Sequence, residues 1–246
     1  MRLNSRAASI VAILGLALLA GGRSALAQTP QPASPAMAEV QQTIATARAE
    51  FDAYRTGGGK PGTPDHPAAK WQAMLWEYRE RYPKTEASAL ATAEAIRLLL
   101  RAELSEQGHA RVDSLDADDA AWVRVPSYLY DEASLRKDFA YAVAKFSDVA
   151  ATTTSAPVKS AALLALGRAQ RRQGDPAAAT KTLEAARAAA PGTASAEDAG
   201  GILYEIAHLS VGLPAPTFSA KARRGGAVDL AGLHGRAVVL IFWAST

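Results

Sequence analysis

The segment at residues 160–193, SAALLALGRAQRRQGDPAAATKTLEAARAAAPGT, constrains the fold more than any other part of the chain. Small and large apolar residues alternate in it at helical spacing. Gly167 and Ala179 allow two antiparallel helices to approach closely, and Leu183 fills the space between them. Pro191 then ends the second helix. The segment therefore predicts a tightly packed pair of helices.

This pattern resembles one tetratricopeptide unit, a 34-residue helical hairpin. The residues that carry the match are Leu163, Leu166, Gly167, Ala179, Leu183, Ala186 and Pro191. Gln170 departs from the pattern, because an aromatic residue is usual at its position. A lone unit cannot bury both of its faces. We therefore expect it to pack on the helices before it and on a further helix over residues 194–209.

Apolar residues at three- and four-residue steps predict helices through most of the preceding sequence. The expected ranges are 37–55, 68–82, 85–107 and 131–151. Pro83 separates the second helix from the third, and Gly108 is expected to end the third. The expected apolar stripe of the fourth consists of Leu135, Phe139, Val143, Phe146 and Val149.

Two loop segments carry residues that are typical of ligand sites. GGGKPGTPDHP at residues 57–67 fails as a phosphate loop because Pro61, and not Ser or Thr, follows Lys60. DSLDADDA at residues 113–120 fails as a calcium loop, since the register places alanine at the required glycine. We interpret the first as a linker and the second as a solvated turn in which Asp116 or Asp118 caps a short helix.

The net charge of +3 belongs to the N-terminal residues. Residues 1–27 contain three arginines and no acidic residue, so the remainder holds 24 basic and 24 acidic residues. The chain after residue 27 therefore has no net positive charge that would attract a polyanion, which argues against a nucleic-acid partner.

Residues 1–27 have the organisation of a secretory signal peptide. Arg2 and Arg6 precede an apolar stretch, and cleavage is predicted after Ala27. The apolar stretch is shorter than the ~20 residues that a membrane-spanning helix needs. An uncleaved anchor remains the alternative. We expect a Pro-rich linker over residues 28–36, a periplasmic or secreted protein, and membrane contact only through the signal peptide during export.

No catalytic, cofactor-binding or metal-binding residue is predicted. The chain contains no cysteine and no G-x-S-x-G motif, and its histidines lie in separate segments without metal-ligand spacing. These histidines are His66, His109, His208 and His234, which we expect to be exposed or to pack in the core. Trp71, Trp76 and Trp122 are expected to pack between helices.

After Leu209 the sequence no longer shows helical spacing and instead contains segments typical of turns and strands. Residues 223–226, RRGG, are typical of a turn between two short strands. The apolar run at residues 237–242 suits a strand that is buried on both faces, as in the centre of an α/β sheet.

Residues 212–246 resemble the start of the periplasmic thioredoxin-like oxidoreductases of the TlpA and redoxin (AhpC/TSA) type. The matching residues are Gly212, Pro214, Ala215, Pro216, Phe218, Gly226, Val228, Leu230, Leu233, Gly235, Arg236 and residues 238–245. Arg236 replaces the usual lysine, Thr217 replaces a common aspartate, and Thr246 replaces a frequent aromatic residue.

The resemblance implies thiol–disulfide exchange by a C-x-x-C motif whose first cysteine follows the position of Thr246. That thiolate would lie at a helix N-terminus, where the helix dipole lowers the thiol pKa. The chain as given lacks both cysteines. We therefore expect an inactive N-terminal portion of such an enzyme, produced by a frameshift, a premature stop or an incomplete gene model.

The predicted organisation is thus mainly α. A tetratricopeptide-like helical domain at residues 37–210 precedes the first strands of a truncated thioredoxin-like α/β domain at residues 211–246. The alternative is that the helical domain is itself the functional unit, a periplasmic scaffold that binds a protein partner.

Overall fold

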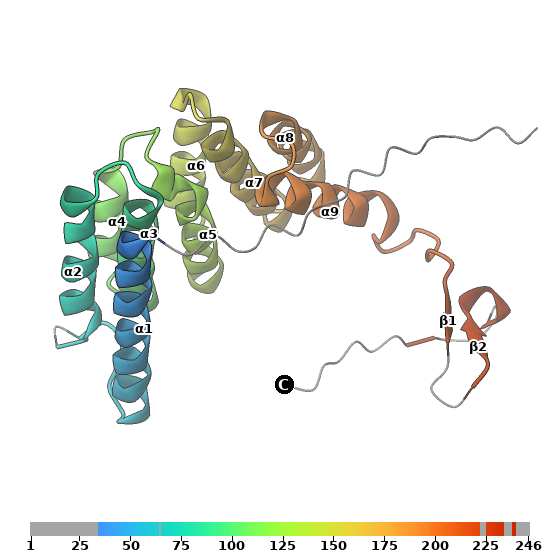
Figure 1. Cartoon of the computed structure of the whole chain (residues 1–246). Helices are drawn as coiled ribbons and strands as arrows, with labels where there is room; N and C mark the ends of the chain where they lie inside the picture. Colours follow the sequence, from blue (N-terminus) through green and yellow to red (C-terminus); the bar gives the residue numbers. More distant parts are fainter. Residues whose placement is uncertain (1–33, 64, 222–224, 234–237, 240–246) are drawn as a thin grey trace, which may run out of the picture. The chain divides into compact units, whose positions relative to one another are not determined.

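The computed structural model describes residues 34–63, 65–221, 225–233 and 238–239 (Figure 1). This part of the chain is mainly α-helical, as predicted, and none of its helices is long and apolar enough to cross a membrane. The predicted signal peptide lies outside the described residues. The α-helices are α1 (Pro35–Thr56), α2 (Ala68–Arg81), α3 (Glu86–Arg101), α4 (Ser105–Asp113), α5 (Val125–Arg136), α6 (Ala140–Thr152), α7 (Ala156–Arg172), α8 (Pro176–Ala189) and α9 (Ala194–His208). Two 3-10 helices, η1 (Ala120–Val123) and η2 (Leu230–Leu233), and two strands, β1 (Ser219–Lys221) and β2 (Ala227–Asp229), complete it.

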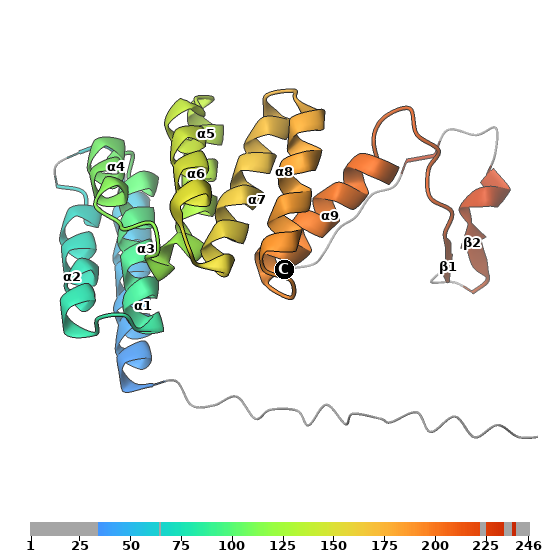
Figure 2. The same cartoon turned by 90° about the horizontal axis from the view of Figure 1, so that it is seen from above.

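Helices α7 and α8 form the helix pair that the sequence predicts. A Cβ atom added at Gly167 would lie 2.7 Å from Cγ of Leu183, so the missing side chain is what allows this approach. Ala179, Leu183 and Ala186 are fully buried. Helix α9 packs on both α7 and α8, and α6 packs on α7 from the other side (Figure 2). The expected packing partners of the pair are confirmed.

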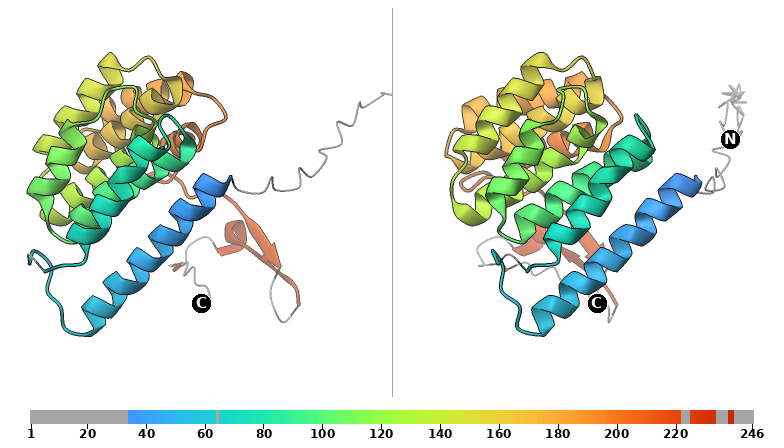
Figure 3. Two further views of the ribbon diagram at one scale, coloured as in Figure 1. Left: turned by 60° about the vertical axis from the view of Figure 1, so that its left-hand side comes forward. Right: turned by 90° about the vertical axis from the view of Figure 1, so that its left-hand side faces the viewer.

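Helices α1, α2 and α3 enclose one apolar core. Val40, Ile44, Trp71 and Leu75 are buried in it, and Figure 3 shows α1 beside the next two helices. Helix α1 begins at Pro35, inside the segment predicted as linker, because the Ser34 side chain accepts a hydrogen bond from the Met37 N–H (3.2 Å) and so caps the helix.

A second core lies between α3, α5, α6, α7 and η1. Its largest side chains are Trp122 and Phe146, which are 2% and 0% exposed. The indole N–H of Trp122 donates to the Asp116 carbonyl oxygen at 3.1 Å, so the polar group of this buried ring is satisfied.

The prediction of one helix over residues 85–107 is wrong. The chain turns at Glu103, whose φ is +58°, and this left-handed residue separates α3 from α4. Gly108 does not end a helix but lies inside α4. A Cβ atom there would come within 2.6 Å of Cδ2 of Leu100, so the glycine allows α4 to pack on α3.

The prediction of one helix over residues 131–151 is also wrong. Lys137 takes a left-handed conformation with φ of +57° and ends α5, after which α6 begins at Ala140. Leu135, expected in the apolar stripe, is 85% exposed because this break ends the helical register. Phe139, Phe146 and Val149 are buried as expected.

The acidic segment before η1 caps this short helix, although the capping residue differs from the prediction. Asp119 accepts from the Ala121 N–H (2.8 Å) at the start of η1. Asp118 instead accepts from the Thr153 hydroxyl (2.7 Å) and from the Thr154 hydroxyl (2.8 Å) and N–H (2.7 Å), in the loop before α7. These hydrogen bonds, that from Thr153 above all, lower the pKa of Asp118 to about 2.

We expect Asp118→Asn to lower the melting temperature at neutral pH by a few degrees and to flatten its pH dependence in acid. The lowered pKa means that Asp118 stabilises the fold above pH ~4, its unfolded pKa, and loses this effect as the pH falls towards 2. Thermal unfolding followed by circular dichroism from pH 7 to pH 2 measures this. Asp116→Asn is the control, since no described group hydrogen-bonds its carboxylate. Equal pH profiles for all three proteins would contradict the assignment.

Strands β1 and β2 form an antiparallel hairpin in which Ala220 lies opposite Val228. Gly225 and Gly226 lie between the two strands at φ of +89° and +81°, and the prediction of two short strands on either side of this segment is confirmed. Arg223 and Arg224 of the predicted turn lie outside the described residues. Most of the strand predicted at residues 237–242 lies outside the described residues. Val238 and Val239 are described, and neither belongs to a strand.

Candidate functional site

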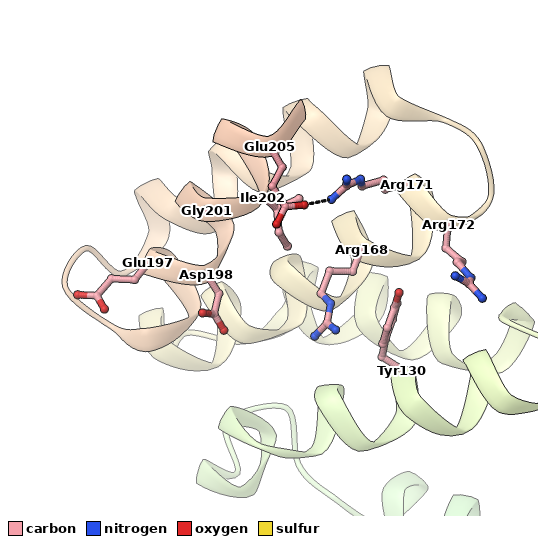
Figure 4. A pocket seen from close by; sticks show the side chains of 9 residues that line it. All are labelled: Tyr130, Arg168, Arg171, Arg172, Glu197, Asp198, Gly201, Ile202 and Glu205. Carbon is pink, nitrogen blue, oxygen red and sulfur yellow. Dashed lines mark hydrogen bonds and ion pairs between the residues drawn. The ribbon is translucent and has the colours of Figure 1, made fainter. Parts of the chain in front are cut away.

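A hollow of about 780 Å³ lies between α5, α7 and α9, and we call it the α7–α9 groove (Figure 4). The two longer helices contribute charged side chains and α5 contributes an aromatic ring. The lining residues are Tyr130, Arg168, Arg171, Arg172, Glu197, Asp198, Gly201, Ile202 and Glu205.

Helical spacing brings these side chains to the groove. On α7 the three arginines lie three and four residues apart, which places them along one side of the helix. On α9 the acidic residues follow the same spacing around Gly201, where an added Cβ would meet no other atom within 4 Å. The groove thus has a basic wall on α7 and an acidic wall on α9.

Only some of the charged side chains of the groove pair with one another. Arg171 Nη1 lies 2.8 Å from Glu205 Oε2. The guanidinium of Arg168 lies over the Tyr130 ring, with Cζ 4.3 Å from the ring centroid, which is a cation–π contact. Among the described residues, no carboxylate lies within 4.0 Å of Arg168 or Arg172. These two arginines are therefore available to an anionic group.

A second hollow of about 690 Å³ adjoins the first, and we call it the α3–α5 groove. Tyr130 and Arg172 line both hollows, so the two hollows are direct neighbours. The other lining residues are Arg97, Leu100, Arg101, Tyr128, Asp131, Glu132, Ser134 and Leu135.

One arginine of the α3–α5 groove is held by a buried carboxylate. Glu94, whose side chain is 5% exposed, accepts from Arg97 Nε at 2.8 Å and from the Tyr128 hydroxyl at 3.2 Å. Burial raises the pKa of Tyr128 to about 12, so its hydroxyl remains a neutral donor. Arg101 has no carboxylate within 4.0 Å among the described residues. Of the two α3 arginines, only Arg101 is free to meet a ligand.

Glu132 lines this groove and also contacts α4. Its Oε2 lies 2.8 Å from Nε2 of His109, and the His109 ring stacks on Tyr141 with a centroid distance of 3.8 Å. His109 is expected from the sequence to be exposed or to pack in the core, and its contact with a carboxylate is not predicted. No sequence signal links the two residues, because the fold alone brings α4 and α5 together.

The remaining residues of interest pack within the fold. Trp71 and Trp122 are buried between helices, as expected, while Trp76 lies half-buried near Arg79 and Arg111 (Cζ to ring centroid 5.0 and 4.3 Å). Burial also lowers the pKa of His66, whose Nδ1 accepts from the Ala68 N–H.

His208 lies beside Tyr204, and His234 lies outside the described residues. In the described part of the chain, no group of three or more His, Asp or Glu side chains is arranged to hold a metal ion.

The groove residues were not singled out from the sequence. The available signal is the run RAQRR at residues 168–172, which places three arginines along one side of a predicted helix. The sequence does not show that Tyr130 and α9 face them. No family model, curated protein or solved structure was found to match this chain.

Proposed function

We propose that the helical domain binds protein partners and that it does so as the N-terminal portion of an exported thioredoxin-like thiol–disulfide oxidoreductase. Residues 37–210 form the binding domain, and residues 211–246 begin the redox domain. The two parts of this proposal rest on different observations and are tested separately.

The binding role rests on the two adjoining grooves. Arg168 and Arg172 flank Tyr130 without a carboxylate partner among the described residues, and the acidic wall of α9 lies across from them. Arginine and tyrosine are among the side chains that contribute most to binding at protein interfaces. A groove with separate basic and acidic walls suits an extended peptide segment that carries both charges.

Charge reversal in the groove is expected to abolish this binding. In the full chain, Arg168→Glu with Arg172→Glu removes two charge-assisted contacts and should weaken partner binding by about 100-fold or more. A photo-cross-linking residue at Ile202 captures the partner, mass spectrometry identifies it, and titration of the purified partner gives the affinity.

The matched control is Lys159→Glu with Lys181→Glu, which makes the same change in charge at exposed positions that line neither groove. Equal affinity of the two double variants, or the absence of any partner that cross-links through Ile202, would remove the binding role.

The redox role rests on the resemblance of residues 212–246 to TlpA and redoxin-type proteins. The described hairpin supports it, since the turn at Gly225 and Gly226 lies where the family has a glycine turn between short strands. The helical turn η2 then carries Leu230 and Leu233, both of which belong to the matching residues.

The coding sequence beyond codon 246 tests the redox role. We expect it to continue directly into C-x-x-C and a thioredoxin-like remainder. Any other continuation would remove the redox assignment and leave the binding role in place. The chain as given has no cysteine, and therefore we expect no reduction of insulin by dithiol exchange.

A further inference from the structure

A third hollow, of about 310 Å³, lies between α1 and α3, and we call it the α1–α3 hollow. Arg48 and Arg55 of α1 line it together with Arg97 and Arg101 of α3, and Asp52 is its one acidic lining residue. Helical spacing explains the cluster, because residues four or seven positions apart lie on the same side of a helix. Four cationic side chains from two helices therefore surround one small space.

Two of these arginines share a single carboxylate oxygen. Oε2 of Glu94 lies 2.8 Å from Arg97 Nε and 3.5 Å from Arg48 Nη2, so both guanidinium groups meet at this atom. The Glu94 side chain is 5% exposed, whereas that of Arg48 is 57% exposed and accessible to a ligand. One carboxylate neutralises only one of two guanidinium groups, and the two positive charges repel each other at this short range. A further negative charge beside Arg48 is therefore favoured.

The other two arginines increase this excess of positive charge. Arg55 is paired with Asp52 at 3.2 Å, and both side chains are mostly exposed. Arg101 has no carboxylate within 4.0 Å among the described residues. Four arginines thus meet two carboxylates, Asp52 and Glu94, and a net charge of +2 remains around the hollow.

We propose that the α1–α3 hollow binds a phosphate monoester group. Such a group carries close to two negative charges above pH ~6, its second pKa, and so matches the net charge of the hollow. Arg101 and Arg48 donate to its oxygens through planar N–H donors, which suit phosphate geometry. Half-buried Phe51 offers apolar surface to the carbon of the ester. The site does not depend on the protein-binding role, because none of its residues lines the α7–α9 groove.

Two probes of the same shape and different charge test the site on the full chain. Methyl phosphate is a dianion at pH 8, and methyl sulfate is a monoanion at any neutral or alkaline pH. NMR titration at low salt should show methyl phosphate binding about tenfold or more tightly than methyl sulfate. Equal binding of the two probes, or no saturable binding of methyl phosphate, would overturn the proposal.

Variants assign the binding to this hollow. Arg101→Gln and Arg48→Gln should each weaken methyl phosphate binding about tenfold or more. The matched control is Arg187→Gln, which removes the same charge at an exposed position that lines none of the three hollows. Circular dichroism checks that each variant is folded. Equal affinity of Arg101→Gln and Arg187→Gln would overturn the site.

Arg101 also lines the α3–α5 groove, so a further variant separates the two places. Arg172 lines that groove but not the α1–α3 hollow, and Arg172→Gln should leave methyl phosphate binding unchanged. Binding that is lost in Arg172→Gln and retained in Arg48→Gln would place the phosphate in the α3–α5 groove and overturn the proposal.

A last comparison identifies the source of the phosphate group, which a soluble ester or a lipid headgroup can supply. Vesicles that contain phosphatidic acid present the same monoester on a membrane. Cosedimentation with these vesicles that is lost in Arg48→Gln but not in Arg187→Gln would support the site and identify a lipid headgroup. Binding of methyl phosphate without cosedimentation would support the site and identify a soluble ester.

Discussion

Replacing Trp122 with alanine is expected to lower the free energy of unfolding by about 3–5 kcal/mol, which is typical of a large aromatic residue removed from a core. The ring is 2% exposed and belongs to the core between α3, α5 and α7. Truncation leaves a cavity and also leaves the Asp116 carbonyl without its indole donor. Chemical unfolding followed by circular dichroism measures the loss.

Two variants show whether the effect comes from this packing. Trp122→Phe keeps much of the ring but loses the indole N–H, so it should cost less than the alanine variant. Val123→Ala, at the adjacent position where the side chain is 41% exposed, should change the stability by no more than about 0.5 kcal/mol. If Trp122→Ala cost as little as Val123→Ala, Trp122 would not be a core residue.

The second large effect is expected at the contact between α7 and α8. Leu183→Ala removes a fully buried leucine and should cost about 2–5 kcal/mol. Gly167→Ala adds a methyl group 2.7 Å from Leu183 Cγ and should cost about 1–3 kcal/mol. The two changes are complementary in volume, so the double variant should be more stable than the sum of the single losses predicts.

A double-mutant cycle measures this coupling from the free energies of unfolding of the four proteins. Gly201→Ala is the control for adding a methyl group to a helical glycine, since nothing lies within 4 Å of its added Cβ. It should stabilise the protein, by up to about 1 kcal/mol. Strict additivity would show that the methyl group added at position 167 does not contact the side chain at position 183.

Much of the helical fold follows from local sequence. The spacing of Val40, Ile44 and Ala47 predicts the buried face of α1, and the small residues at Gly167 and Ala179 predict the close approach of α7 and α8. Both patterns are local, because all residues of the first lie on one face of one helix and all residues of the second lie in two consecutive helices.

The breaks between helices could not be predicted in the same way. Glu103 and Lys137 adopt left-handed conformations that glycine usually supplies, so neither residue signals a break. The apolar spacing also continues across each break, and for this reason residues 85–107 and 131–151 both resemble one helix. Tertiary packing of α4 and α6 decides the outcome.

The grooves depend on contacts between distant parts of the chain. Arg168 meets Tyr130, and Glu132 meets His109, only after α4, α5 and α7 have packed. The sequence shows where the arginines are, but it does not show which of them lack a carboxylate partner among the described residues.

Helix α3 belongs to both larger cores, with Ala91, Ala95 and Leu98 on one side and Ala93, Ile96 and Leu100 on the other. Residues 91–96 and 98–100 of α3 are all buried, so most substitutions at these positions are expected to destabilise the fold. Because α3 packs in both cores, a substitution that destabilises one core is expected to destabilise the other as well. The part of the chain from α1 to α7 is therefore expected to unfold as one cooperative block and not one repeat at a time.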